Sequence, residues 1–154
     1  MKLLAEDSRV LFIGQSVGYP GTYMSSTLSG LESRIELPVA EELQMGMSIG
    51  LALSGYIPVS IYPRWNFLIL ATNQLVNHLD KMKSHVIVRV GVGSERPMYP
   101  GPQHVGDFTS AFQLMCRNIS FERLGKARNI VPAYRRALKR DGPTVLVEYA
   151  EKYQ

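Results

Sequence analysis

Hydrophobic and polar positions along this chain alternate between two patterns. Short apolar or β-branched runs, which are typical of strands, occur at residues 10–13, 57–61, 86–90, 120–124 and 144–148. Between them lie segments in which apolar residues recur every three or four positions, as in helices, at residues 40–54, 67–83, 108–117 and 127–140. Because strands and helices alternate, we predict an α/β fold, with a mainly parallel sheet covered by helices on both faces.

The first two predicted helices differ in how their apolar residues are arranged. In the helix at 67–83, one core-facing stripe contains Leu68, Ala71, Leu75, Leu79 and Met82. The helix at 40–54 is apolar on most sides, so we expect it to be buried. Its Gly46, Gly50 and Ser54 fall on one stripe at intervals of four. Since each interior glycine costs about 1 kcal/mol relative to alanine, we expect another backbone, from this chain or from another subunit, to approach that stripe closely.

Length and charge narrow the class of protein. With 154 residues, of which 45% are hydrophobic and 19% charged, the chain suits a single globular domain over residues 1–154. The net charge of +4 is modest, and the basic residues are spread out. A mild basic cluster on the helix at 127–140 fits a solvated helix face, so we do not expect nucleic-acid binding. Its members are Arg128, Arg135, Arg136, Lys139 and Arg140.

The single cysteine, Cys116, cannot form a disulfide within the chain, so we expect a reducing, cytoplasmic location. It follows the apolar run at 111–115, which predicts a buried structural thiol. The start of the sequence shows no signal-peptide pattern, and no apolar run approaches the roughly 20 residues that a membrane span requires. We therefore expect no membrane association.

The segment PVAEELQMGMSIG, residues 38–50, carries the first candidate chemistry. A proline precedes two adjacent carboxylates, Glu41 and Glu42, at the predicted start of a helix. Unpaired backbone amides and the helix dipole favour negative charge there, so both side chains could be ordinary first-turn residues. The two lie about 100° apart around a helix, which predicts different surroundings for each.

Several motifs together resemble the pyrimidine-binding domain of the transketolase and 2-oxo-acid dehydrogenase beta-subunit family of thiamine diphosphate enzymes. The family's Pro, aliphatic, Ala, Glu sequence before a glycine-spaced helix is matched at residues 38–41. Its Gly-x-x-Pro strand, Arg-x-x-Phe motif and Gln-aliphatic-Val-Asn helix end are matched within GYIPVSIYPRWNFLILATNQLVNH, residues 55–78. GPQH at 101–104 resembles its Gly-Pro-x-His loop, and DGPTVLVEY at 141–149 its last strand. Because the motifs keep their order over nearly the whole chain, they are more specific together than any one alone. The chain is therefore similar to that domain as a stand-alone subunit.

The resemblance implies roles for four residues. Glu41 matches the glutamate that hydrogen-bonds a ring nitrogen of the cofactor's aminopyrimidine, and Phe67 matches an aromatic residue that lies against that ring. Arg64, the third residue of the implied cofactor site, would meet an anionic substrate or a partner's carboxylate. His104 matches a histidine that contacts substrate and exchanges protons near neutral pH, so Glu41 and His104 are the implied catalytic residues. Without the resemblance, these positions also fit a core aromatic, an exposed arginine and a solvated loop histidine.

The resemblance also implies a reaction and a partner. The family cleaves or forms a carbon-carbon bond next to a carbonyl, by 2-oxo-acid decarboxylation or dehydrogenation, or by ketol transfer. Its members need a second domain, with a Gly-Asp-Gly motif, that holds magnesium and the diphosphate. This sequence has only GDF at residue 106 and DGP at residue 141, and its three histidines and one cysteine lack metal-ligand spacing. The implied assembly is therefore a hetero-oligomer with paired subunits, in which a separate diphosphate-binding subunit holds most of the magnesium contacts.

The chain also departs from the family pattern after its first predicted strand. Many beta subunits carry acidic residues after the first strand, where this chain has Gln15 and Ser16. GQSVGYPG in the same place is a weak lookalike of a phosphate-binding loop, but no lysine or helix start follows it, so we interpret it as a turn.

One alternative function is a non-catalytic regulatory or scaffold subunit of such a complex, which would have no need of a buried acid at Glu41. The other is a flavodoxin-like nucleotide-binding domain that works alone.

Overall fold

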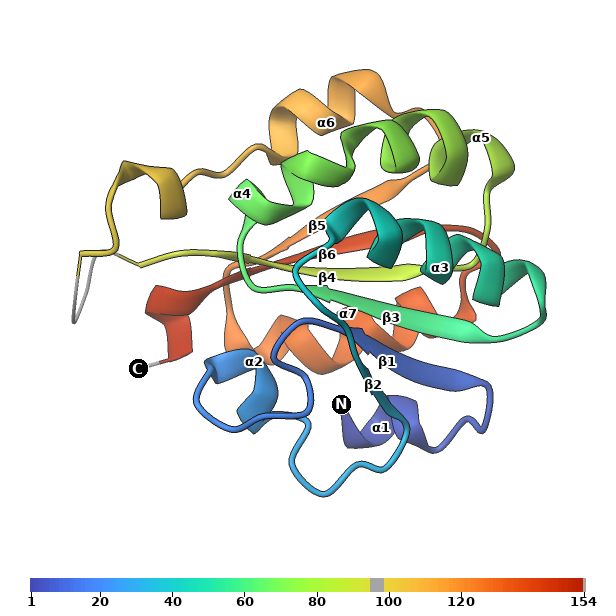
Figure 1. The fold of residues 1–154 in the computed structure, drawn as a ribbon, viewed down its shortest axis with the longest axis horizontal. Helices are drawn as coiled ribbons and strands as arrows, with labels where there is room; N and C mark the ends of the chain where they lie inside the picture. The colour runs from blue at the N-terminus through green and yellow to red at the C-terminus, as the bar shows by residue number, and fades with distance from the viewer. Residues whose placement is uncertain (95–98, 154) are drawn as a thin grey trace.

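A computed structural model describes residues 1–94 and 99–153 (Figure 1). Six strands form one sheet in the order β2-β1-β3-β4-β6-β5, and every neighbouring pair is parallel. The prediction of an α/β fold with a parallel sheet is confirmed. The strands are β1 (Val10–Gly14), β2 (Arg34–Glu36), β3 (Ile57–Tyr62), β4 (Ile87–Val92), β5 (Ser120–Leu124) and β6 (Thr144–Tyr149).

Helices cover both faces of the sheet, as Figure 1 shows. On one face lie α3 (Glu41–Leu53), α4 (Trp65–Leu68), α5 (Asp80–Met82) and α6 (Thr109–Met115). On the other lie α1 (Lys2–Ala5), α2 (Tyr23–Ser26) and α7 (Ala127–Lys139). The remaining helical turns are η1 (Ile69–Ala71), η2 (Gln74–Leu79), η3 (Pro102–His104) and η4 (Ala150–Tyr153). Every predicted strand and helix corresponds to an observed segment, whereas β2, α1 and α2 are too short for their periodicity to be recognised.

The predicted helix at 67–83 is not one regular α-helix. The chain runs from α4 through the 3₁₀ turn η1 and the π-helical turn η2 into α5. Leu68, Ala71, Leu75 and Leu79 are fully buried, as the core stripe predicts. Met82 is 48% exposed, so the prediction is wrong for this residue. It lies in the last turn, next to Lys83, whose left-handed backbone (φ 56°) ends the helix.

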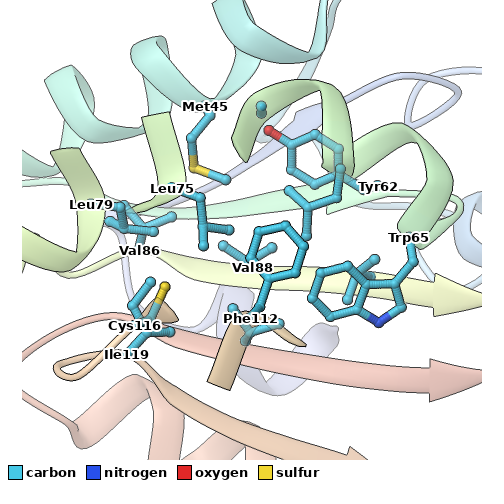
Figure 2. Close-up of a cluster of buried hydrophobic side chains, with 14 of the residues drawn as sticks. Met45, Tyr62, Trp65, Leu75, Leu79, Val86, Val88, Phe112, Cys116 and Ile119 are labelled. Carbon is cyan, nitrogen blue, oxygen red and sulfur yellow. The ribbon is translucent and has the colours of Figure 1, made fainter. Parts of the chain in front are cut away.

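The core consists of two buried clusters, one on each face of the sheet. Figure 2 shows the cluster beneath α3 to α6, where Met45, Tyr62, Trp65, Val88 and Phe112 come together. The ring centroids of Trp65 and Phe112 lie 5.1 Å apart in a stacked arrangement. The cluster on the other face joins α1, α2 and α7 to β1, β3, β4 and β6. Burial on both faces explains why the central strands are continuous apolar runs in the sequence.

Cys116 belongs to the first cluster and is 6% exposed (Figure 2). Burial, and then the negative charge of Asp80, raise the pKa of its thiol to about 11. A thiol with that pKa is protonated at neutral pH and reacts slowly. The prediction of a buried structural cysteine is confirmed.

The basic cluster on α7 lies on the exposed side of that helix. Arg128, Arg135, Arg136, Lys139 and Arg140 are all exposed, whereas the buried side carries Ala133, Tyr134 and Ala137. Arg136 pairs with Glu122 of β5. The prediction of a solvated helix face is confirmed. Within the described ranges, no helix is both long and apolar enough to cross a membrane.

A buried ion pair joins β4 and β6 on the face of the sheet that α2 and α7 cover. The sequence pattern predicts only apolar burial there. Arg89 of β4 and Glu148 of β6 are each 1% exposed, and Arg89 Nη2 lies 2.7 Å from Glu148 Oε2. Glu148 Oε1 accepts a hydrogen bond from the hydroxyl of Tyr134 on α7, at 2.6 Å. Arg89 Nη1 donates to the carbonyl of Met24 on α2 and to Thr27 Oγ1. The pair therefore ties both α7 and α2 to the sheet.

Replacing Arg89 by methionine should strongly destabilise the fold, because Glu148 would then be a buried charge without its cation. We expect the free energy of unfolding to fall by about 3 to 5 kcal/mol, measured by urea denaturation. The control is Arg9→Met, which removes the exposed ion pair with Asp7 and should change stability much less. Equal losses in the two variants would contradict the importance of the buried pair.

Candidate functional site

The carboxyl edge of the sheet carries all four residues that the sequence singles out. In a parallel sheet every strand leaves at the same edge, and the crevice forms where the strand order reverses, here beside β1. Glu41 begins the helix that follows β2, and Arg64 and Phe67 follow β3. His104 comes after β4, in η3. Residues 95–98, between β4 and η3, lie outside the described residues.

Glu41 is the first residue of α3 and is 4% exposed. It lies on the helix face of Gln44, Met45 and Ser48, which is the face packed against the sheet. Its Oε1 accepts a hydrogen bond from Gln15 Nε2, at 3.1 Å. Its neighbour Glu42 is exposed, so the two carboxylates have different surroundings, as predicted.

The start of α3 is attached firmly to β3. Gln44 is fully buried, and its Nε2 donates to Ser60 Oγ at 3.1 Å and to the carbonyl of Ile61 at 2.9 Å. The hydroxyl of Tyr62 donates to the carbonyl of Glu41, at 3.2 Å. Burial raises the pKa of Tyr62 well above its usual value, so this hydroxyl stays a neutral donor. These contacts fix the backbone from which the Glu41 side chain extends.

The loop after β1 approaches the same place from the other side. Gly14 has a φ of 156°, and a Cβ there would lie 2.4 Å from the carbonyl oxygen of Ile61. Only glycine allows this close approach, which places Gln15 beside Glu41. The next three backbone amides, of Ser16, Val17 and Gly18, donate to the carboxylate of Glu36.

A cleft of about 530 Å³ lies at the same edge of the sheet, between the segments that follow β1, β3 and β4. Its lining consists of Gly21, Thr22, Tyr23, Pro63, Arg64, Phe67, Pro100 and His104. The rings of Phe67 and His104 meet edge to face, with centroids 5.8 Å apart. The guanidinium carbon of Arg64 lies 6.0 Å from the centre of the Tyr23 ring. The cleft thus offers a cation, an imidazole and aromatic walls.

Three of the four predicted site residues, Arg64, Phe67 and His104, share this cleft, and Glu41 does not line it. Tyr23, which sequence analysis missed, completes one wall. It lies in a turn-rich segment without periodicity, so no sequence signal marks it. Burial raises the pKa of Tyr23 to about 12, so its phenol is uncharged near neutral pH.

The glycine stripe of α3 is open rather than buried. Apart from the adjoining residues and backbone of α3 itself, no described atom lies within 4 Å of a Cβ built on Gly46 or Gly50. Leu43 and Leu53 nearby are 52% and 62% exposed. The expectation that α3 is buried is therefore wrong for this face of the helix within the chain. Glu42, four positions before Gly46, lies on this stripe, whereas the Glu41 side chain lies on the opposite, sheet-facing side.

Within residues 1–94 and 99–153, no three histidine, cysteine, aspartate or glutamate side chains gather in a way that could hold a metal ion.

Comparison with known proteins identifies the family of this chain. The family described as "Transketolase, pyrimidine binding domain" matches residues 1–154. The chain belongs to this family, whose members bind thiamine diphosphate.

The chain is similar to subunits of 2-oxo-acid dehydrogenases. It is 26% identical to the beta subunit of the pyruvate dehydrogenase E1 component from Chaetosphaeridium globosum, over 97% of this chain and 49% of that protein. It is 33% identical to the 3-methyl-2-oxobutanoate dehydrogenase subunit beta of Mycobacterium tuberculosis, over 53% of this chain and 25% of that protein. The chain thus spans about half or less of the length of these relatives.

Two solved structures share the fold. A transketolase from Campylobacter jejuni superposes with a TM-score of 0.80 and 20% identity, over 94% of this chain and 23% of that one. A structure described as "Split gene transketolase, inactive beta4 tetramer" gives a TM-score of 0.76 and 17% identity, over 96% of this chain and 48% of that one.

Replacing Gly14 by alanine should disturb the loop that carries Gln15, because the new methyl group would collide with the Ile61 carbonyl. We expect the free energy of unfolding to fall by about 1 to 3 kcal/mol, measured by urea denaturation. Gly125→Ala is the control, since a Cβ on Gly125 meets nothing within 4 Å among the described residues. Similar stability of the two variants would show that the loop tolerates a side chain at residue 14.

Proposed function

We propose that this chain is the pyrimidine-binding subunit of a split thiamine diphosphate-dependent enzyme. Together with a separate diphosphate-binding subunit, it would act on a carbon-carbon bond next to a carbonyl, in a 2-oxo-acid or ketol substrate. The observation that carries the proposal is Glu41, a buried carboxylate at the carboxyl edge of the sheet. One of its oxygens is held by Gln15, and no described donor reaches the other.

The residues present fit the cofactor's aminopyrimidine. No described donor reaches Oε2 of Glu41, so this oxygen would accept from a ring nitrogen, and burial limits the access of water to the carboxylate. Phe67 offers an aromatic surface, and its contact with His104 fixes the orientation of the ring. When bound, thiamine diphosphate supplies a carbon nucleophile that adds to the substrate carbonyl. In this arrangement Glu41 holds the proton that the ring nitrogen shares.

The cleft at the carboxyl edge of the sheet suits the substrate. Arg64 would bind an anionic group of the substrate, such as a carboxylate or a phosphate. His104, at the rim of the cleft, would give and take protons near the reacting carbonyl. Tyr23 fixes the position of Arg64 through the contact between the ring and the cation.

The open face of α3 supports a protein partner. Exposed leucines flank two glycines that leave room for a second backbone. We propose that this face, defined by Leu43, Gly46, Gly50 and Leu53, packs against another subunit. A partner subunit with a Gly-Asp-Gly motif would hold the magnesium ion and the diphosphate.

The first test is reconstitution. The chain is coexpressed with the product of a neighbouring reading frame that carries a Gly-Asp-Gly motif, and the copurified complex is titrated with thiamine diphosphate and magnesium. We expect a stable complex that takes up the cofactor and speeds exchange of its thiazolium C2 proton in D₂O. Glu41→Gln should slow this exchange by roughly 10²- to 10⁴-fold, because the shared proton is lost.

The control is Glu32→Gln, which alters an exposed carboxylate just before β2, outside the open face of α3, and should leave proton exchange unchanged. Without a complex or cofactor uptake, the split-enzyme proposal fails. Cofactor uptake without acceleration of proton exchange would instead favour the scaffold function.

A second test separates the stability of the chain from its assembly. Gly46→Ala should stabilise the isolated chain by up to about 1 kcal/mol, because alanine favours the helix and the site is open. The same substitution should weaken binding to the diphosphate-binding subunit, since the methyl group occupies room needed by the partner. Urea denaturation and isothermal titration calorimetry measure the two effects. Unchanged affinity would place the partner on another face.

A further inference from the structure

Resting on the proposed function, we propose that Gln15 is a positioning residue for Glu41. Its side-chain amide holds Oε1 of Glu41 as an acceptor, so that Oε2 alone is left to share the proton with the cofactor's ring nitrogen. The two residues are 26 positions apart in the sequence and meet only because their loops leave the same edge of the sheet.

The chemistry of the pair is one-directional. In this structure the NH₂ group of Gln15 faces Glu41, and an NH₂ group only donates, so in this orientation Oε1 accepts whether the carboxyl group is charged or protonated. When Glu41 is protonated, its O–H is therefore placed on Oε2. An acidic residue in the place of Gln15 would need a proton of its own to do the same. The amide thus makes the orientation of Glu41 independent of a second titrating group.

Glu36 fixes the loop that presents Gln15. Its carboxylate accepts hydrogen bonds from three successive amides, of Ser16, Val17 and Gly18, at 2.7, 2.8 and 2.7 Å. Ser16 has a left-handed backbone (φ 56°), which helps to turn these amides toward one point. Because the bound amides begin at the residue after Gln15, they limit the directions in which its side chain can extend.

The other partner is equally constrained. Gln44 bonds to Ser60 and Ile61, and Tyr62 bonds to the backbone of Glu41, so the first turn of α3 is fixed to β3. Both ends of the 3.1 Å contact are therefore anchored to the sheet before any ligand arrives. Such preorganisation is what a proton-sharing group requires.

The contact itself is tested on the isolated chain by NMR. The side-chain NH₂ signals of Gln15 should shift in Glu41→Ala and stay in place in the matched variant Glu42→Ala. Signals that ignore Glu41→Ala would overturn the proposal, because no positioning contact would exist. This measurement needs neither cofactor nor partner.

The role is tested in the reconstituted complex, by the exchange of the C2 proton of bound thiamine diphosphate in D₂O. Gln15→Met keeps the volume and removes the donor. We expect the exchange rate to fall by roughly 10- to 100-fold, while cofactor affinity stays within about twofold. Gln113→Met, an exposed glutamine on α6, is the control and should change neither quantity.

The outcomes separate the two proposals. If the wild-type complex exchanges rapidly and Gln15→Met does the same, the positioning role is wrong and the proposed function stands. If the wild-type complex takes up no cofactor, the proposed function fails, and the positioning role fails with it, even where NMR shows the contact.

Glu36→Gln tests the support of the loop. It should speed hydrogen exchange of the amides at residues 16–18 by at least about tenfold in the isolated chain. In the complex it should slow exchange of the C2 proton, as Gln15→Met does. Glu32→Gln, an exposed carboxylate just before β2, is the matched control. Loop amides that stay protected in Glu36→Gln would show that Glu36 does not fix this loop.

Discussion

The parallel direction of all six strands is the constraint on which the rest of this molecule depends. Because every strand ends at the same edge, every following loop or helix starts there, and residues far apart in the sequence meet. Gln15, Glu41 and Arg64 follow three different strands and reach this edge for that reason alone. The buried pair of Arg89 and Glu148 holds the neighbouring strands β4 and β6 together beneath it. The pair also holds α2 in place, and α2 contributes Tyr23 to the wall of the cleft.

Much of this architecture follows from the sequence. The five predicted strands and the helix α3 appear close to their expected bounds, because buried parallel strands and long helices have strong periodicity. The strand β2 has three residues at the sheet edge and gives no such signal. Arg89 and Glu148 interrupt apolar runs whose pattern indicates only burial, and their pairing depends on the register of β4 against β6. The prediction that Met82 belongs to the core stripe is wrong because the helix ends at this residue.

The site was predictable in parts. The motif resemblance selects Glu41, Arg64, Phe67 and His104, and the structure brings the last three into one cleft. What the sequence could not provide are contacts made through folding, such as the one between Gln15 and Glu41. The helical spacing of Gly46 and Gly50 predicts that another backbone approaches this stripe, and the described part of the chain leaves that room open. It does not indicate that Glu41 faces away from that room. Which side of the helix faces the sheet becomes known only from the packing of the helix in the folded chain.

The carboxylate of Glu36 has a consequence for ligands. In doubly wound folds, the amides of the first loop after β1 commonly bind the pyrophosphate of a nucleotide. In this chain those amides already surround an anion supplied by the protein itself. A nucleotide phosphate would have to displace the carboxylate of Glu36, which belongs to the same chain. This disfavours the flavodoxin-like function. The polypeptide thus fills its own anion-binding loop, and the phosphates of a ligand would have to bind at another place.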